Sequence, residues 1–378
     1  MSEAQIMRYQ IPCLFLIVFW SSWIALHAQE KVPKKNIEDE IIRVDTELVE
    51  IPVVVTDKLG KPLLNLKPAN FTVFEDNKLQ EVTDFSAISA PFEVALLLDT
   101  SGSARSDLQL IQRSAQNFIN ALRPGDKVSI IAFKTDTKDN RAVSVTEVLT
   151  GLTDNRITLR AALERVKTSN GTPYYEGLLK VAESVFNEAP KAEVRGRRAL
   201  VALTDGVDST SISDFDEAKE MLERAGIITY FIQVNTRDFF EQNLLGDCES
   251  AIRFSAAQIR RYYRVFYANA NIEKAANFCQ LGDFERLAIS KKLYELAAAE
   301  MNSLANASGG KVFPVGDLSD ARTAFKSVAD EIGTKYSLGY YSANAKRDGT
   351  YRKIKVELKG LPAGAQIRAR EGYTARTN

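Results

Sequence analysis

The 378-residue chain carries 49 basic and 49 acidic side chains, so its formal net charge is zero. A nucleic-acid-binding protein normally has a basic excess or a basic patch, so this balance argues against a nucleic-acid partner. Apolar residues make up 45% and charged residues 26% of the chain, as in ordinary soluble globular proteins, and the length is sufficient for two or three domains.

The first 28 residues have the pattern of a secretory signal peptide. Arg8 precedes the apolar stretch 11–26, and a small residue, Ala28, marks the expected cleavage site. Cys13 lies inside the apolar stretch and not beside its end, which argues against a lipid-modified start. The alternative is an uncleaved membrane anchor, although the stretch is shorter than the ~20 residues that a spanning helix needs. We expect a secreted, periplasmic or cell-envelope protein that meets a membrane only through a retained signal segment.

Residues 29–40 are a polar linker, and residues 41–90 are predicted to form a β-rich N-terminal domain. Within 41–90, apolar and polar residues alternate as in antiparallel strands, and Asp76-Asn77 is expected to form a turn between two of them.

From residue 91 to residue 335 the pattern changes to that of an α/β domain. Continuous apolar runs, typical of parallel strands covered on both faces, alternate with amphipathic segments of helical period. The runs expected to be strands are 92–98, 127–133, 197–204, 227–234 and 311–315. This order predicts a Rossmann-like, doubly wound and mostly parallel sheet.

Residues 236–290 interrupt this alternation and are interpreted as a helical insertion. Once the chain is exported, Cys248 and Cys279 are expected to form a disulfide, and two free buried thiols are the alternative. Tyrosine, phenylalanine and arginine side chains between Arg260 and Tyr267 would suit either a partner-binding face or a self-packing helical hairpin.

The C-terminal segment 336–378 again reads as strands, with a hairpin predicted at Asp348-Gly349. Because β-rich segments flank the α/β domain on both sides, the two segments are candidates for two halves of one β-sandwich.

The only histidine is His27, at the expected cleavage site. A mature chain without histidine can neither run a Ser-His-Asp or Cys-His mechanism nor build a histidine-ligated zinc site. No GxxxxGK[ST] loop is present for nucleotide phosphates. We therefore do not expect an enzyme.

Oxygen-bearing side chains follow the predicted strands at the edge where ligands collect in doubly wound sheets. Asp99, Ser101 and Ser103 follow the first strand, Thr172 lies in a loop between two helices, and Asp205 ends another strand. Oxygen donors of this kind select a hard cation, Mg²⁺ first and Mn²⁺ or Ca²⁺ as competitors. Two carboxylates with three neutral hydroxyls leave a divalent ion electrophilic, so an Asp or Glu of a protein partner could complete its coordination.

The DTSGS stretch at 99–103, Thr172 in NGTP and Asp205 in LTDG resemble the metal-ion-dependent adhesion site of von Willebrand factor type A domains. The resemblance covers residues 90–340 apart from the insertion, and the whole layout is similar to secreted bacterial proteins of this type. It implies a cation-dependent protein-binding domain in which Ser101, Ser103 and Thr172 coordinate the ion directly. Asp99 and Asp205 would bind it directly or through water.

Two other functions remain open at this stage. One is an envelope scaffold with a purely structural metal, and the other is a metal-assisted hydrolase, for which Glu176 is the nearest candidate base in sequence. Asp136 and Asp208 match no position of the site and are interpreted as solvated loop charges.

Overall fold

The computed structural model describes residues 48–86, 90–101, 108–267 and 277–377. They belong to one compact unit, Asp45–Asn378. The predicted signal peptide, the linker and the site residue Ser103 lie outside the described residues. Within the described ranges, no helix combines the length and the apolar character that crossing a membrane requires.

The centre of the α/β part is a six-stranded sheet with the order β10-β9-β8-β5-β6-β7. All neighbouring pairs are parallel except β6 and β7, which are antiparallel. The strands are β5 (Glu93–Leu98), β6 (Lys127–Lys138), β7 (Arg141–Thr153), β8 (Arg198–Thr204), β9 (Ile228–Val234) and β10 (Lys311–Val315). The predicted doubly wound, mostly parallel sheet is confirmed, whereas β7 was not predicted.

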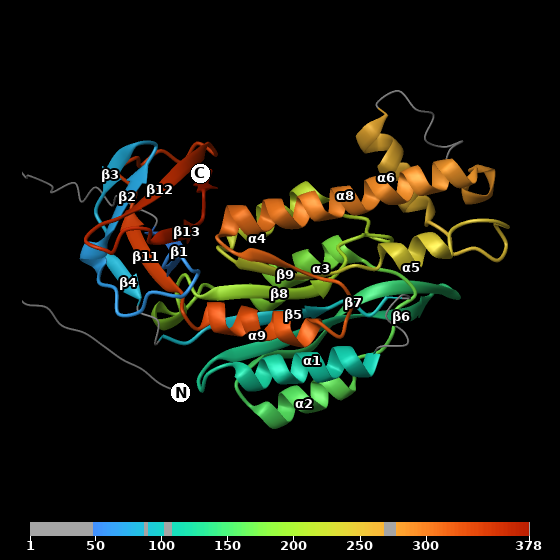
Figure 1. Ribbon diagram of the computed structural model, residues 1–378, viewed down its shortest axis with the longest axis horizontal. Helices are drawn as coiled ribbons and strands as arrows, with labels where there is room; N and C mark the ends of the chain where they lie inside the picture. Colours follow the sequence, from blue (N-terminus) through green and yellow to red (C-terminus); the bar gives the residue numbers. More distant parts are fainter. Residues whose placement is uncertain (1–47, 87–89, 102–107, 268–276, 378) are drawn as a thin grey trace, which may run out of the picture. The chain divides into compact units, whose positions relative to one another are not determined.

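Helices cover both faces of this sheet (Figure 1). Because successive side chains of a strand point to opposite faces, Leu96 and Leu98 join the core under one set of helices and Leu97 joins the core under the other. The first set is α1 (Leu108–Ala121), α2 (Arg156–Glu164) and α9 (Ala321–Ile332), and the second is α3 (Tyr174–Lys180), α4 (Phe215–Arg224) and α8 (Asp283–Ser308). Short helical turns occur at Pro68–Asn70, Val181–Val185, Ala192–Val194 and Phe278–Gln280.

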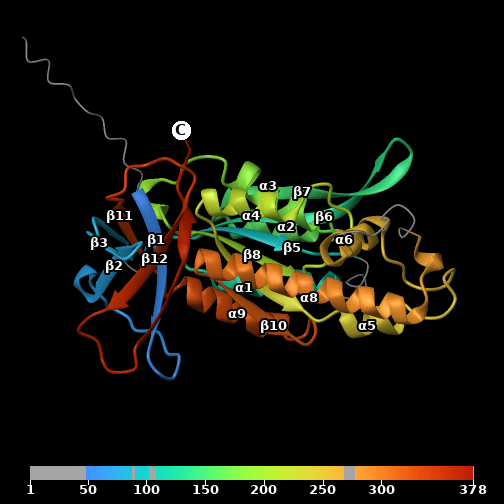
Figure 2. The ribbon, with the colours of Figure 1, turned by 90° about the horizontal axis from the view of Figure 1, so that it is seen from above.

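The predicted insertion contains α5 (Arg237–Gln242) and α6 (Ala256–Phe266), which lie beside the amino-terminal half of α8 (Figures 1 and 2). The predicted disulfide between Cys248 and Cys279 is present. Tyr262 is buried in a small apolar core that the insertion shares with α8, so this part of the predicted aromatic face packs inward.

The flanking strands form two four-stranded sheets, with orders β13-β1-β11-β4 and β14-β12-β2-β3. These strands are β1 (Leu48–Thr56), β2 (Phe71–Glu75), β3 (Lys78–Gln80), β4 (Asp84–Ser86), β11 (Tyr336–Tyr341), β12 (Tyr351–Leu358), β13 (Gln366–Ala369) and β14 (Gly372–Thr374). Each sheet combines strands from both ends of the chain, and both sheets bury side chains in one apolar core. This arrangement agrees with two halves of one β-sandwich.

Two local predictions for these strands have opposite outcomes. The Asp76-Asn77 turn is confirmed, since both residues have positive φ and join the paired strands β2 and β3. Among the described strands of the 41–90 segment, however, only β2 and β3 pair with each other, so the segment does not form an antiparallel sheet of its own.

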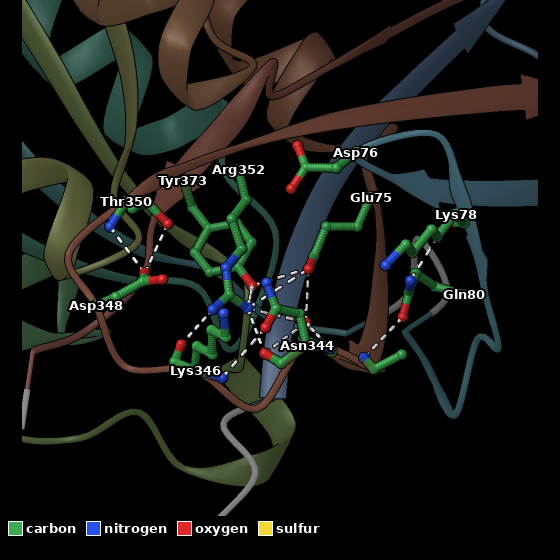
Figure 3. Close-up of polar contacts among 12 residues, drawn as sticks. Glu75, Asp76, Lys78, Gln80, Asn344, Lys346, Asp348, Thr350, Arg352 and Tyr373 are labelled. Atoms are coloured by element: carbon green, nitrogen blue, oxygen red, sulfur yellow. Dashed lines mark hydrogen bonds and ion pairs between the residues drawn. The ribbon is translucent and has the colours of Figure 1, made fainter.

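The predicted hairpin at Asp348-Gly349 is wrong, because the strands before and after it, β11 and β12, lie in different sheets. The connection is held instead by Arg352, whose guanidinium donates hydrogen bonds to the carbonyl oxygens of Asn344 and Lys346 and lies beside the Glu75 carboxylate (Figure 3).

Candidate metal site

Asp99 and Asp205 lie at the carboxyl ends of two neighbouring parallel strands. In the register of β5 and β8, Leu98 is opposite Leu203, and the Asp99 amide donates a hydrogen bond to the Leu203 carbonyl over 2.9 Å. The adjacency of these strands therefore brings together two carboxylates that are far apart in sequence.

The Asp99 side chain is buried and held at both oxygens. Its Oδ1 accepts a hydrogen bond from the Ser101 amide (3.0 Å), and its Oδ2 accepts one from the Thr204 hydroxyl (2.8 Å). Burial disfavours the charged form and raises the pKa of Asp99 above its ordinary range, although both hydrogen bonds act in the opposite direction.

The Asp205 side chain is held by its own loop and by the segment that follows β9. Its Oδ1 accepts a hydrogen bond from the Val207 amide (2.9 Å), and its Oδ2 accepts one from the Thr236 hydroxyl, which also bonds the Tyr294 hydroxyl on α8 (2.8 Å). Burial, and then the negative charge of Asp99, raise the pKa of Asp205 to about 7.

Thr172 is buried in the loop before α3, which is tied to the loop after β8. The Thr172 amide donates to the Ser209 hydroxyl (2.7 Å), and the Ser209 amide donates to the Thr172 carbonyl (3.0 Å). The loops approach so closely that a Cβ at Gly171 would lie 2.7 Å from Cγ2 of Thr210, so only glycine fits there without movement.

Four of the five predicted ligands line two cavities that have Ser101, Asp205 and Thr236 in common. Ser101, Thr172 and Asp205 line a cavity of about 460 Å³. Asp99, Ser101 and Asp205 line a second space of about 30 Å³. The fifth residue, Ser103, lies outside the described residues.

The donor set fits a hard divalent cation. Asp99 is buried, Asp205 is half-buried, and their negative charges repel one another, so a bound cation would offset the charge that these two carboxylates bring together. The buried Tyr174 hydroxyl has no hydrogen-bond partner; burial, then the charge of Glu300, and after it the charges of Asp99 and Asp205 raise its pKa far above the ordinary value. Within the part of the chain that the structure describes, no three His, Cys, Asp or Glu residues cluster as a metal site. The predicted set contains only two such residues, since its other donors are hydroxyls.

Sequence reasoning missed the residues that support these ligands and misjudged one acid. Thr204 and Thr236 orient the two carboxylates, and no spacing pattern marked them. Asp208, interpreted as a solvated charge, is buried, accepts a hydrogen bond from the Tyr174 amide (3.0 Å) and has its pKa raised by burial to about 7. Asp136 is exposed, as expected, and lies near Lys134.

Residues 94–207 match the family model of the von Willebrand factor type A domain. A comparison with curated proteins finds no match. Together with the sheet order, the family match supports a von Willebrand factor type A-like α/β fold with additional antiparallel sheets.

The solved structures to which the chain is similar at low identity include the following three proteins. The conserved hypothetical protein BatB from Bacteroides thetaiotaomicron is 18% identical, with 64% of this chain and 98% of that protein covered and a TM-score of 0.37. A von Willebrand factor type A protein from Catenulispora acidiphila is 11% identical, with coverages of 88% and 75% and a TM-score of 0.41. Proximal thread matrix protein 1 from the mussel byssus, with a zinc-occupied adhesion-site motif, is 14% identical. The match covers 68% of this chain and half of the mussel protein, with a TM-score of 0.41.

Proposed function

We propose that the von Willebrand factor type A domain of this chain binds a divalent cation and, through it, an acidic group of a protein ligand. The ion would be held by Asp99, Ser101, Ser103, Thr172 and Asp205. The observation that carries the proposal is that Ser101, Thr172 and Asp205, which come from three separate segments, line one cavity, with Asp99 beside Ser101 and Asp205 in the adjoining space.

The charge of the donor set favours an acidic ligand. Two carboxylates match the formal charge of a divalent cation and do not exceed it, and the hydroxyl ligands add no negative charge. The ion therefore still attracts a further oxygen donor. Mg²⁺ is the first candidate, with Mn²⁺ and Ca²⁺ as competitors. The disulfide and the signal-like N-terminus support a secreted, periplasmic or envelope location for this binding.

Hydrolysis at the same site has less support. Glu176, the candidate base, uses its Oε1 to accept hydrogen bonds from the amides of Ile212 (2.6 Å) and Ser213 (3.1 Å), so this oxygen holds a loop. A structural metal in an envelope scaffold is the second candidate, because a cation that offsets the repulsion between Asp99 and Asp205 would also stabilise the fold.

Calorimetric titration of the purified mature chain with Mg²⁺ tests the metal site. We expect Asp99→Ala and Thr172→Ala to lose Mg²⁺ binding while circular dichroism shows a retained fold. The matched control is Asp136→Ala, which removes an exposed carboxylate on the same sheet. Unchanged Mg²⁺ affinity in both site variants would refute the site.

Affinity capture from envelope extracts separates binding from a scaffold role. Capture of a partner should be lost when EDTA removes the metal if the ion mediates contact. Capture that persists in EDTA, with the fold unchanged, would favour the structural metal.

A further inference from the structure

The 460 Å³ cavity beside the proposed metal site has walls of two kinds. Its polar side carries the proposed ligands Ser101, Thr172 and Asp205. Its other side is apolar and is formed by the insertion and by α8, through Phe239, Phe240, Ile252, Phe254, Leu293 and Tyr294. The volume lies within the ~300–1,000 Å³ of typical small-ligand pockets, so it exceeds what a metal and one carboxylate would need.

The apolar wall is a packed structure. The rings of Phe240 and Phe254 are 5.2 Å apart, those of Phe240 and Tyr294 are 6.4 Å apart, and Phe254 also contacts Phe278 beside the disulfide. A wall whose members pack against one another is available for a ligand without prior rearrangement.

The same wall is bonded to the proposed metal ligands. Tyr294 bonds the Thr236 hydroxyl, which donates to Asp205. On the other side, the Ser255 hydroxyl at the start of α6 donates to the Ser209 carbonyl (2.6 Å), and Ser209 is bonded to Thr172. The apolar wall and the ion site are therefore held in a fixed relation.

The charge on this wall suits an acidic ligand. Arg253 lines the cavity between the apolar residues Ile252 and Phe254, and its Nε donates to the Cys248 carbonyl (2.8 Å). A guanidinium at this position is attractive to a ligand that brings a carboxylate to the metal.

We propose that the ligand is a protein segment in which the metal-binding Asp or Glu is directly flanked by a large apolar side chain, which fills the cavity between the insertion and the proposed metal site. The inference rests on the proposed function, because the acidic residue must reach the ion. The insertion then selects among acidic segments, and a polar neighbour such as serine leaves the apolar wall in water.

An array of capped heptapeptides tests this selection. Each peptide has Asp at its centre, and the two neighbouring positions carry each of the twenty amino acids in turn. We expect Phe, Tyr, Leu or Met beside Asp to strengthen Mg²⁺-dependent binding about 10- to 100-fold over Ser, the ratio expected from burying one large apolar side chain. Replacing the central Asp by Asn should abolish binding.

Two variants test whether the cavity causes the preference for an apolar residue beside Asp. Phe239→Ser removes a cavity-lining ring that is 53% exposed, and it should weaken the preference while Mg²⁺ affinity stays unchanged. Phe284→Ser removes a 92% exposed ring that is not part of the cavity, and it should leave the preference intact.

The possible failures are distinguishable. Equal Mg²⁺-dependent binding of all Asp peptides would overturn the apolar selection and leave the proposed function standing. Absence of Mg²⁺-dependent binding to every peptide would overturn the selection as well, and Mg²⁺ titration by calorimetry would then decide whether the metal site itself fails. A preference that survives Phe239→Ser unchanged would place the selecting surface elsewhere and refute the inference.

Discussion

Arg352→Met should destabilise the β-sandwich more than any exposed charge change on the same strand. The Arg352 and Glu75 side chains are only 3% and 2% exposed and lie 3.5 Å apart across the pairing of β12 with β2 (Figure 3). Met keeps much of the aliphatic volume but removes the positive charge. It also removes the donors that bond the carbonyl oxygens of Asn344 and Lys346.

The expected loss of stability depends on the Glu75 carboxylate, which Arg352→Met leaves buried without its partner. Removing one partner of a buried ion pair typically costs about 3–5 kcal/mol, because the other charge stays buried without compensation. Here the Glu75 carboxylate keeps hydrogen bonds from the hydroxyls of Tyr340 (2.7 Å), Tyr373 (2.9 Å) and Ser342 (2.6 Å). These hydrogen bonds partly stabilise the carboxylate after the positive charge of Arg352 is removed. We therefore expect the free energy of unfolding to fall by about 3 kcal/mol, the lower end of that range.

Urea unfolding followed by far-ultraviolet circular dichroism measures the change in the free energy of unfolding. The matched control is Lys355→Met, on the same strand, whose partner Glu357 is 2.7 Å away but 45% exposed. Exposed pairs contribute about 0–1 kcal/mol, so this variant should lie close to the wild type. The reasoning is refuted if the two variants differ by less than about 1 kcal/mol.

Three further predictions concern other parts of the fold. Burial lowers the pKa of Lys335 to about 7, so between pH 7 and its ordinary value of 10.5 the unfolded chain binds a proton that the folded chain lacks. Stability should therefore rise with pH in this window by at most about 1.4 kcal/mol per unit, and urea titrations of Lys335→Met should lack that rise. The Cys248–Cys279 bridge closes 31 residues, so replacing both cysteines by serine should lower stability by about 3–4 kcal/mol, and alkylation without reductant should find no free thiol in the wild type. Thr236→Val removes a donor to Asp205 and should weaken Mg²⁺ binding about 10- to 100-fold in calorimetry, and an unchanged affinity would show that this hydroxyl does not position the carboxylate.

The strands β5, β8 and β9 and the first half of β6 could be predicted because they are buried on both faces and read as continuous apolar runs. β7 escaped prediction because it is an edge strand: most of its side chains are half-buried or exposed, so it shows neither a continuous apolar run nor a clear alternation. The pairing of the flanking strands could not be predicted from the sequence for a different reason. The partners of β1 are β11 and β13, which lie at the other end of the chain, and alternation along a strand carries no information about its partner.

The residues of the candidate site likewise include some that could be predicted from the sequence and some that could not. Asp99, Ser101, Thr172 and Asp205 were found because each follows or connects regular elements at the sheet edge where ligands collect. Thr236 and Tyr294 were not found, because their role depends on which segments meet in space. Asp208 was misjudged because its side chain is buried and accepts a hydrogen bond from the first amide of α3, that of Tyr174, in addition to one from Ser211 in its own loop.

The insertion contacts the segments that carry the candidate site, although its place in the sequence does not indicate this. Its first long helix begins at Ser255 with a capping box, and the same hydroxyl that caps α6 also donates to the Ser209 carbonyl. Further along α6, Arg261 forms an ion pair with Glu300 and lies over the ring of Tyr175, which directly follows Tyr174 in α3. The insertion is thus bonded through Ser255 and Thr236 to the loop after β8 that carries Asp205, and through Arg261 it contacts α3, the helix that follows Thr172. The insertion therefore forms one wall of the cavity proposed here to bind the ligand, and its disulfide lies next to this wall, since the Cys248 carbonyl accepts the hydrogen bond of Arg253.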